Sequence, residues 1–199
     1  MNRQTRVCIT GGIGSGKSVI SRILRLKGYR VYDCDSEAKK IMESSPEIIM
    51  QIEKILNCSC IDSIGQLNKK AIADIIFADK EKRQKVNSVV HKAVRDDFNS
   101  VCSNHKEKIV FIETAIPSTA AIADMVDRIW LVSAPETLRM SRIKIRNGLS
   151  ECEIKKRISS QKAEFDSLPA EKTSVIINDG ISPVLPEIDS LLSSSRIFT

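Results

Sequence analysis

Eight consecutive residues, Gly11 to Ser18, follow the pattern G-x-x-x-x-G-K-S, which is typical of a phosphate-binding loop between a strand and a helix. The glycines let the backbone curl so that successive N–H groups face phosphate oxygens, and the following helix adds the positive end of its dipole. We expect catalytic Lys17 to reach the β- and γ-phosphates of ATP and the Ser18 hydroxyl to ligate Mg²⁺. The loop residues predicted to bind ATP are Gly12, Ile13, Gly14, Ser15, Gly16, Lys17 and Ser18.

Two aspartates, Asp33 and Asp35, end the strand predicted at 29–33. In parallel α/β sheets, ligands gather beyond the carboxyl ends of the strands, where a phosphate-binding loop also lies. We predict that Asp35 is the catalytic base that takes the proton of an acceptor hydroxyl, and that Asp33 supports the metal shell directly or through water. Both are predicted to bind the acceptor substrate. The alternative is that one of them only caps the following helix.

A third carboxylate, Glu113, follows four apolar residues at 109–112. An apolar strand that ends in an acid resembles the strand that holds a magnesium-bound water in many nucleotide-binding proteins. We therefore count Glu113 among the substrate-binding residues. A helix cap or a turn acid at the end of a strand is the alternative.

Arginines are concentrated on a predicted helix at 134–150. Arg142 and Arg146 are four residues apart and share a face, and the planar guanidinium binds phosphate oxygens with two nitrogens. We predict that both bind ATP and act catalytically by closing over it, whereas a solvated helix face is the competing interpretation, more so for Arg139. Arg157 and Gln161 on the next helix are equally compatible with closure and with a solvent-facing role.

Apolar runs predict strands at 5–10, 29–33, 108–113, 127–132 and 174–178, and helical periodicity fills most of the intervening chain. Helices are expected to follow the glycine loop and to cover about 36–42, most of 47–105, 134–150, 150–165 and 182–199. The second helix is expected to end near Pro46, and Ser150 is expected to cap its helix with Glu153. Alternating strands and helices predict a parallel sheet covered on both faces.

Composition narrows the class of protein. The chain has 199 residues, a net charge of +6, six cysteines without a C-x-x-C pair, and 4% aromatic residues. No run approaches the roughly 20 apolar residues of a membrane span. Basic and acidic residues alternate, and aromatic side chains do not lie among them, so no platform for nucleic acid is evident. We expect a cytoplasmic protein with reduced cysteines and without membrane, nucleic-acid or obligatory protein partners.

An ordered set of segments resembles the dephospho-coenzyme A kinase family over nearly the whole chain. The set consists of ITGGIGSGKS, the pair Asp33 and Asp35, GQLNKKAIADIIFAD, His91, APETLRMSRIKIRNGLS with RISSQ, and IINDG. Two segments depart from the family pattern: Lys92 follows His91 where proline is usual, and ETAIPST has Glu113 and Thr119 where aspartate and glutamate are usual.

The resemblance implies a three-layer P-loop fold with five parallel strands, formed by a single chain. The core would comprise 1–57, 107–136 and 166–199, a helical subdomain for the coenzyme moiety 58–106, and a lid 137–165. It also implies transfer from ATP to the ribose 3′-hydroxyl of dephospho-coenzyme A, with Asp35 as base, Mg²⁺ as cofactor and His91 among the substrate-binding residues.

Three other functions are compatible with the loop. A kinase for another small molecule, such as a nucleoside or nucleotide, would use the same loop, base and lid. A nucleotide-dependent switch is less favoured, because the chain lacks the Asn-Lys-x-Asp pattern of guanine recognition. A nucleic-acid-binding ATPase is suggested by positive charge alone.

Overall fold

A computed structural model describes residues 4–194 of the chain. They form two compact units, one made of 4–32 with 106–194 and the other of 33–105. The helical unit thus begins at Asp33 rather than at residue 58, because the two helices before residue 58 pack on a long helix of the same unit. Whether this unit binds the coenzyme moiety stays a prediction.

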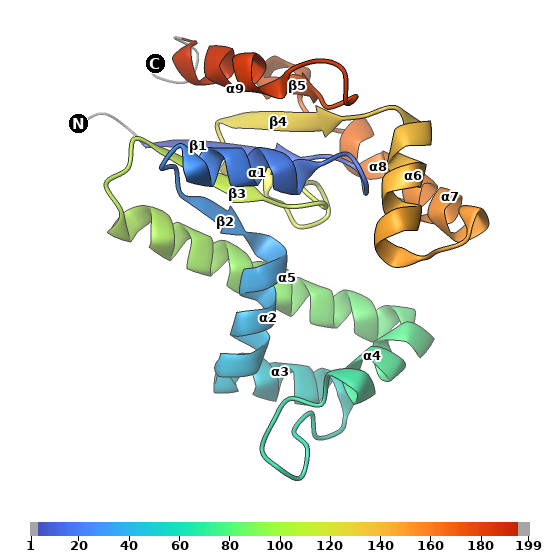
Figure 1. Ribbon diagram of the computed structural model, residues 1–199. Helices are drawn as coiled ribbons and strands as arrows, with labels where there is room; N and C mark the ends of the chain where they lie inside the picture. The colour runs from blue at the N-terminus through green and yellow to red at the C-terminus, as the bar shows by residue number, and fades with distance from the viewer. Residues whose placement is uncertain (1–3, 195–199) are drawn as a thin grey trace. The chain divides into compact units, whose positions relative to one another are not determined.

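The first unit is built on a five-stranded sheet (Figure 1). Its elements are β1 (Thr5–Thr10), α1 (Lys17–Leu26), β2 (Val31–Asp33, which ends at the boundary), β3 (Ile109–Glu113), the 3₁₀ turn η1 (Ala123–Met125), β4 (Arg128–Ser133), α6 (Glu136–Asn147), α7 (Glu151–Ser160), α8 (Lys162–Asp166), η2 (Ala170–Lys172), β5 (Thr173–Ile177) and α9 (Val184–Ser193). The strand order is β2-β3-β1-β4-β5, and β3, β4 and β5 pair in parallel with their neighbours. The predicted fold class is confirmed.

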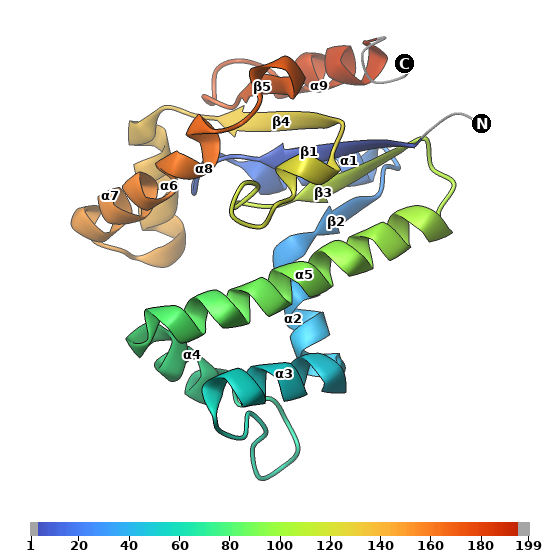
Figure 2. The same ribbon diagram turned by 180° about the vertical axis from the view of Figure 1, so that it is seen from behind.

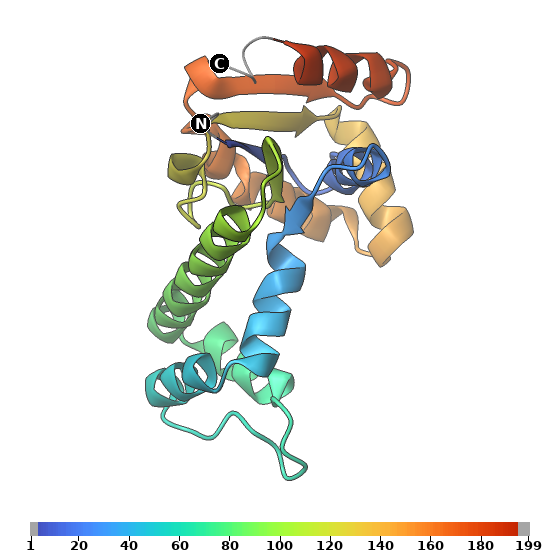
Figure 3. The same cartoon turned by 90° about the vertical axis from the view of Figure 1, so that its left-hand side faces the viewer.

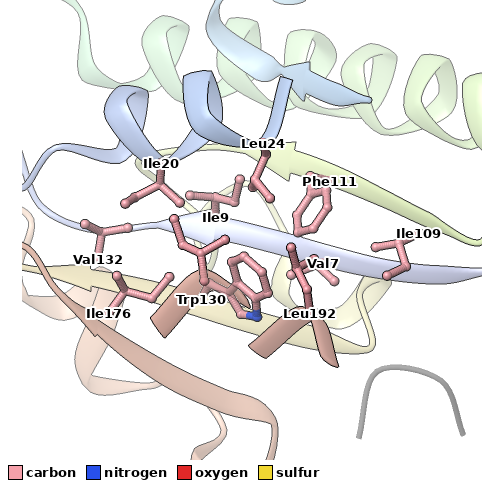
Figure 4. Close-up of a cluster of buried hydrophobic side chains, with 11 residues drawn as sticks. Val7, Ile9, Ile20, Leu24, Ile109, Phe111, Trp130, Val132, Ile176 and Leu192 are labelled. Carbon is pink, nitrogen blue, oxygen red and sulfur yellow. The ribbon is translucent and has the colours of Figure 1, made fainter. Parts of the chain in front are cut away.

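One buried apolar cluster holds the sheet to the helices (Figure 4). Alternate residues of β1, Val7 and Ile9, face Ile20 and Leu24 of α1, as the period of two along a strand requires. The cluster continues through the other strands and α9 with Ile109, Phe111, Trp130, Val132, Ile176, Ile188 and Leu192. Cys8, between Val7 and Ile9, is fully buried as well, so both faces of β1 are covered.

The second unit contains four helices, α2 (Cys34–Ser44), α3 (Pro46–Leu56), α4 (Lys69–Ala78) and α5 (Lys80–Asn104). The first three all pack on α5, and Figure 3 shows α2 and α5 side by side. Every fourth residue of α5 from Val86 to Cys102 is buried. The predicted helical region with a loop before residue 69 is confirmed. Pro46 does not merely end a helix: Ser45 ends α2 and caps α3, and proline takes the first position of α3, where its missing N–H is not needed.

Most other sequence-based boundaries differ from the structure by a few residues at most, and one predicted helix is interrupted. Ser150 and Glu153 form the predicted capping box, and Gly148 ends α6 in the left-handed conformation. The interrupted helix is the one predicted over 150–165, which breaks at Gln161 and continues as the short α8. The predicted tail helix is α9, and residues 195–199 lie outside the described part of the chain.

Two further features of the structure concern membrane insertion and the cysteines. Within residues 4–194, no helix has the length and apolar character needed to cross a bilayer. All six cysteines are free. Desolvation raises the pKa of the Cys8 thiol to about 12, and the more distant Lys172 and Lys17 only partly oppose this effect. Cys8 therefore stays a neutral, unreactive thiol at physiological pH, as expected of a structural cysteine.

Candidate active site

The carboxyl ends of four strands place the site residues of the first unit at one edge of the sheet. The glycine loop follows β1, Glu113 ends β3, α6 follows β4, and Asn178 follows β5. The register brings Ile9 opposite Glu113 and Ser133 opposite Ile177. Figure 1 shows α6, α7 and α8 beyond the end to which the β4 arrow points. This edge is where ligands bind in parallel α/β sheets.

The backbone of the loop Gly11–Gly16 requires glycine at two positions. Gly14 and Gly16 have φ of 79° and 98°, in the left-handed region that a side chain disfavours. A Cβ on Gly16 would also collide with Nδ2 of Asn178. Gly16 caps α1, so the first amides of that helix follow the loop directly. The backbone thus has the curled conformation that the predicted phosphate binding requires, and phosphate binding itself stays a prediction.

The outward carbonyls of the loop are held by three side chains. Nε of Arg139 donates to the Ile13 carbonyl at 2.9 Å, and Nδ2 of Asn178 donates to the Ser15 carbonyl at 2.8 Å. Arg142 donates through Nη1 to the carbonyls of Gly14 and Ser15, each at 3.3 Å, and through Nη2 to that of Asn178 at 3.2 Å. Two loop amides are engaged as well, that of Ile13 with Gln161 and that of Ser15 with the Gly12 carbonyl, so an anion would be bound by the amides of the other loop residues and of the first turn of α1.

Arg139 is therefore more involved than the sequence indicated. Its guanidinium lies against the Cα of Gly12, where it would collide with an added Cβ. Burial lowers the pKa of Arg139 from its ordinary value, and Glu136 opposes the shift. The side chain nevertheless stays charged at any working pH, because arginine titrates far above neutrality.

Gln161 and Lys17 contact the loop from inside the same unit. Oε1 of Gln161 accepts a hydrogen bond from the Ile13 amide at 2.7 Å, which brings the end of α7 to the loop. Nζ of Lys17 donates to the Gly11 carbonyl at 2.7 Å, so the ammonium group lies over the loop. Lys17 is thus close to where the phosphates are predicted to bind.

Three other predicted residues of this unit differ in exposure. Arg146 is exposed, and its Nε donates to Oδ1 of Asn147 at 3.0 Å. Arg157 is exposed on α7. Glu113 is half-buried at the end of β3. Their predicted roles in ATP and substrate binding stay predictions.

Asp33 and Asp35 have separate local roles within the helical unit. Oδ1 of Asp33 accepts from the amides of Asp35 and Ser36, and its Oδ2 accepts from the Ser36 hydroxyl, so Asp33 caps α2. In the part of the chain that the structure describes, the Asp35 carboxylate makes no hydrogen bond or ion pair, and the residue is exposed. Asp35 is therefore not committed to a structural contact, whereas Asp33 is. His91 is half-buried on α5.

The residues present are suitable for Mg²⁺ bound together with a nucleotide. Ser18 is exposed at the start of α1. No group of three or more His, Cys, Asp or Glu side chains within residues 4–194 could hold a metal by itself. Mg²⁺ is commonly held by one or two protein ligands together with waters and substrate phosphates, so the absence of an all-protein cage is compatible with it.

Comparison with known proteins places this site in a family. The sequence model of dephospho-CoA kinase matches residues 5–183. A dephospho-CoA kinase from Bacteroides fragilis is 39% identical over 191 residues, which covers 94% of this chain and 91% of the relative. The chain belongs to the dephospho-CoA kinase family. The resemblance inferred from the sequence motifs is thereby confirmed.

Solved structures have the same fold as this dephospho-CoA kinase family member. A protein from Thermus thermophilus superposes with a TM-score of 0.77 at 27% identity, covering 96% of this chain and 95% of that one. A dephospho-CoA kinase from Campylobacter jejuni gives a TM-score of 0.65 at 20% identity, covering 95% and 98%. The fold thus extends over nearly the full length of each.

Sequence reasoning underestimated two contacts with the loop and missed a third. For Arg139 a solvated helix face competes with ATP binding more strongly than for Arg142 and Arg146, and for Gln161 the sequence is equally compatible with closure and with a solvent-facing role. Asn178 was noted only as part of IINDG, although its place after the last predicted strand could have indicated a position at the ligand edge.

Replacing Arg142 by alanine tests the support of the loop by α6. The change removes three charge-assisted hydrogen bonds to backbone carbonyls. Since such bonds contribute about 1.5–3 kcal/mol, we expect ATP affinity to fall roughly 10- to 100-fold. Titration calorimetry with ATP and Mg²⁺ measures the change, and Lys144→Ala, an exposed position on the same helix, is the matched control. Equal affinities of the Arg142 variant and the control would contradict the role.

Proposed function

We propose that this protein transfers the γ-phosphoryl group of ATP to the ribose 3′-hydroxyl of dephospho-CoA, giving CoA and ADP, the last step of CoA synthesis. The observation that carries the proposal is a complete phosphate-binding loop, held in a cradle conformation, in a chain that matches the dephospho-CoA kinase family over residues 5–183. The relatives that carry this name support the choice of acceptor.

The loop and its supports act on the donor. Among the amides of 14–18, that of Ser15 donates to the Gly12 carbonyl at 3.0 Å, and the others bind the β- and γ-phosphates. Lys17 lies within reach to offset charge that develops during transfer. Arg139, Arg142 and Asn178 fix the outward carbonyls, so the amides are oriented before ATP arrives. Preorganised dipoles of this kind stabilise a transition state without reorganising during the reaction.

Asp35 acts on the acceptor. An exposed carboxylate without a structural partner among the described residues is available to accept the proton of the 3′-hydroxyl as the oxygen attacks phosphorus. We assign the metal to Ser18, with Asp33 supporting it through water. When bound, Mg²⁺ supplies neutralising charge to the β- and γ-phosphates. Asp33 also caps α2 and so fixes the backbone of Asp35.

The six free cysteines favour a reducing compartment, so we place this activity in the cytoplasm. ATP and dephospho-CoA are the proposed small-molecule partners, and no nucleic acid or protein partner enters the proposal.

Measuring ADP release against a panel of acceptors tests the proposed function. We expect turnover with dephospho-CoA and none above background with nucleosides or nucleoside monophosphates, because the latter lack the pantetheine portion. The product should gain the mass of one phosphoryl group and carry it on the ribose 3′-oxygen, which phosphorus NMR resolves. Turnover restricted to nucleosides would replace the proposed acceptor, and ATP hydrolysis without any acceptor dependence would contradict kinase activity altogether.

A further inference from the structure

We infer that Glu164 is a positioning residue for nucleotide binding, which holds the lid residue Gln161 on the phosphate-binding loop. The inference deepens the proposed function and rests on it for the identity of the nucleotide. Neither the family membership nor the loop motif assigns a role to this side chain.

Glu164 is an unusual acid because only 9% of its surface is exposed. Its Oε2 accepts from the amides of Ser118 at 3.1 Å and Thr119 at 3.0 Å, and its Oε1 accepts from the Thr119 hydroxyl. The Ser118 hydroxyl donates in return to the Glu164 backbone carbonyl at 2.9 Å. A buried carboxylate with this many donors is fixed in one orientation.

The segment 114–119, to which Glu164 is hydrogen-bonded through Ser118 and Thr119, is itself hydrogen-bonded to the sheet. It follows β3, and the Thr114 amide at its start donates to the carbonyl of Ile9 in β1 at 3.1 Å. The Ile116 amide then donates to the Thr114 hydroxyl at 3.2 Å. Figure 2, which shows the molecule from behind, places α8 beyond the end to which the β4 arrow points. Glu164 thereby links α8 to β1, the strand that leads into the phosphate-binding loop.

Gln161 lies three residues before Glu164, in a turn that the contacts of Glu164 hold in place. The Glu164 amide donates to the Gln161 carbonyl at 3.1 Å, so both belong to the same turn at the junction of α7 and α8. The Gln161 side chain accepts from the Ile13 amide, while Arg139 donates to the Ile13 carbonyl. Ile13 is thus held on both sides, between two glycines that would otherwise leave the loop free to move. Removing the Glu164 carboxylate should therefore weaken the contact between Gln161 and the Ile13 amide.

The test is a double-mutant cycle on nucleotide affinity. We expect Glu164→Ala to weaken binding of ATP with Mg²⁺ about 5- to 10-fold, the upper part of the range expected for the loss of one neutral hydrogen bond, here that between Gln161 and the Ile13 amide. Glu164→Gln should remain within about 3-fold of the parent, because its oxygen can accept from both amides and its NH₂ can donate to Thr119. In a Gln161→Ala background, Glu164→Ala should have little further effect, which identifies Gln161 as the residue through which it acts.

Controls separate positioning from folding and from the proposed reaction. Asp166→Ala, an exposed position on α8, should leave ATP affinity unchanged. Thr119→Val removes one donor without emptying the site, so it should shift affinity in the same direction by less and keeps the test valid if Glu164→Ala does not fold. Unchanged affinity in Glu164→Ala, or additive losses in the cycle, would overturn the inference. Calorimetry needs no acceptor, so parent protein that binds ATP but does not phosphorylate dephospho-CoA would contradict only the proposed function.

Discussion

The Asp35→Asn variant is expected to lose turnover by roughly 10²- to 10⁴-fold, the range typical of a general base, while ATP affinity changes little. Asparagine has the shape of aspartate but cannot take a proton from the acceptor hydroxyl. The carboxylate of Asp35 makes no structural contact among the described residues, so its loss should not disturb α2. Steady-state kinetics with dephospho-CoA, together with ATP calorimetry, measures both quantities.

Two variants sharpen the Asp35 experiment. Asp33→Asn keeps a side chain that caps a helix well, so it removes charge from the predicted metal shell without releasing the start of α2. Its loss of activity should be relieved by raising Mg²⁺, whereas that of Asp35→Asn should not. Glu47→Gln, at an exposed acid on α3, controls for charge in the same unit. Parent-like turnover of Asp35→Asn would refute the assignment of the base.

The Lys17→Ala variant is expected to lower turnover by about 10²- to 10³-fold, as other removals of a donor aimed at developing charge do. The ammonium group is held at 2.7 Å from the Gly11 carbonyl, so it is already over the loop before substrates bind. Unlike Asp35→Asn, this variant should also bind ATP more weakly, because Lys17 contacts the phosphates in the ground state. Single-turnover kinetics at saturating ATP separates the two effects.

A length-matched control accompanies the lysine experiment. Lys17→Met retains most of the side-chain volume and should behave like the alanine variant if charge is the cause. Lys144→Ala, exposed on α6, should behave like the parent. Recovery of activity in Lys17→Met would indicate that packing, rather than charge, explains the loss.

Local patterns predicted the fold and the loop because each depends on neighbours in sequence. Strand alternation around Val7 and Ile9, the capping box at Ser150, and glycine spacing in the loop are all properties of short segments. The boundary near residue 58 was different, because α2 and α3 join the helical unit through packing on α5, and no local signal reports such contacts.

The same limit explains what was missed at the site. The helix predicted over 150–165 breaks at Gln161 without a glycine or proline to indicate it. In the sequence Glu164 is one of several charged residues in 150–165 and no local signal distinguishes it, whereas in the structure its carboxylate is buried on Ser118 and Thr119. The roles of Asp33 and Asp35 stay predictions that the proposed variants test, and the roles of His91 and Glu113 in substrate binding stay predictions as well.

The strand order puts β1 in the middle of the sheet, with ladders to β3 and β4 on either side. Its amide protons should therefore be among the slowest to exchange with deuterium, since they are released only when the whole sheet opens. The phosphate-binding loop begins where β1 ends, so its first residue is attached to the part of the sheet that opens last. Fraying at the outer strand β5 or at the chain ends would leave the start of the phosphate cradle in place, so partial opening and loss of nucleotide binding need not occur together.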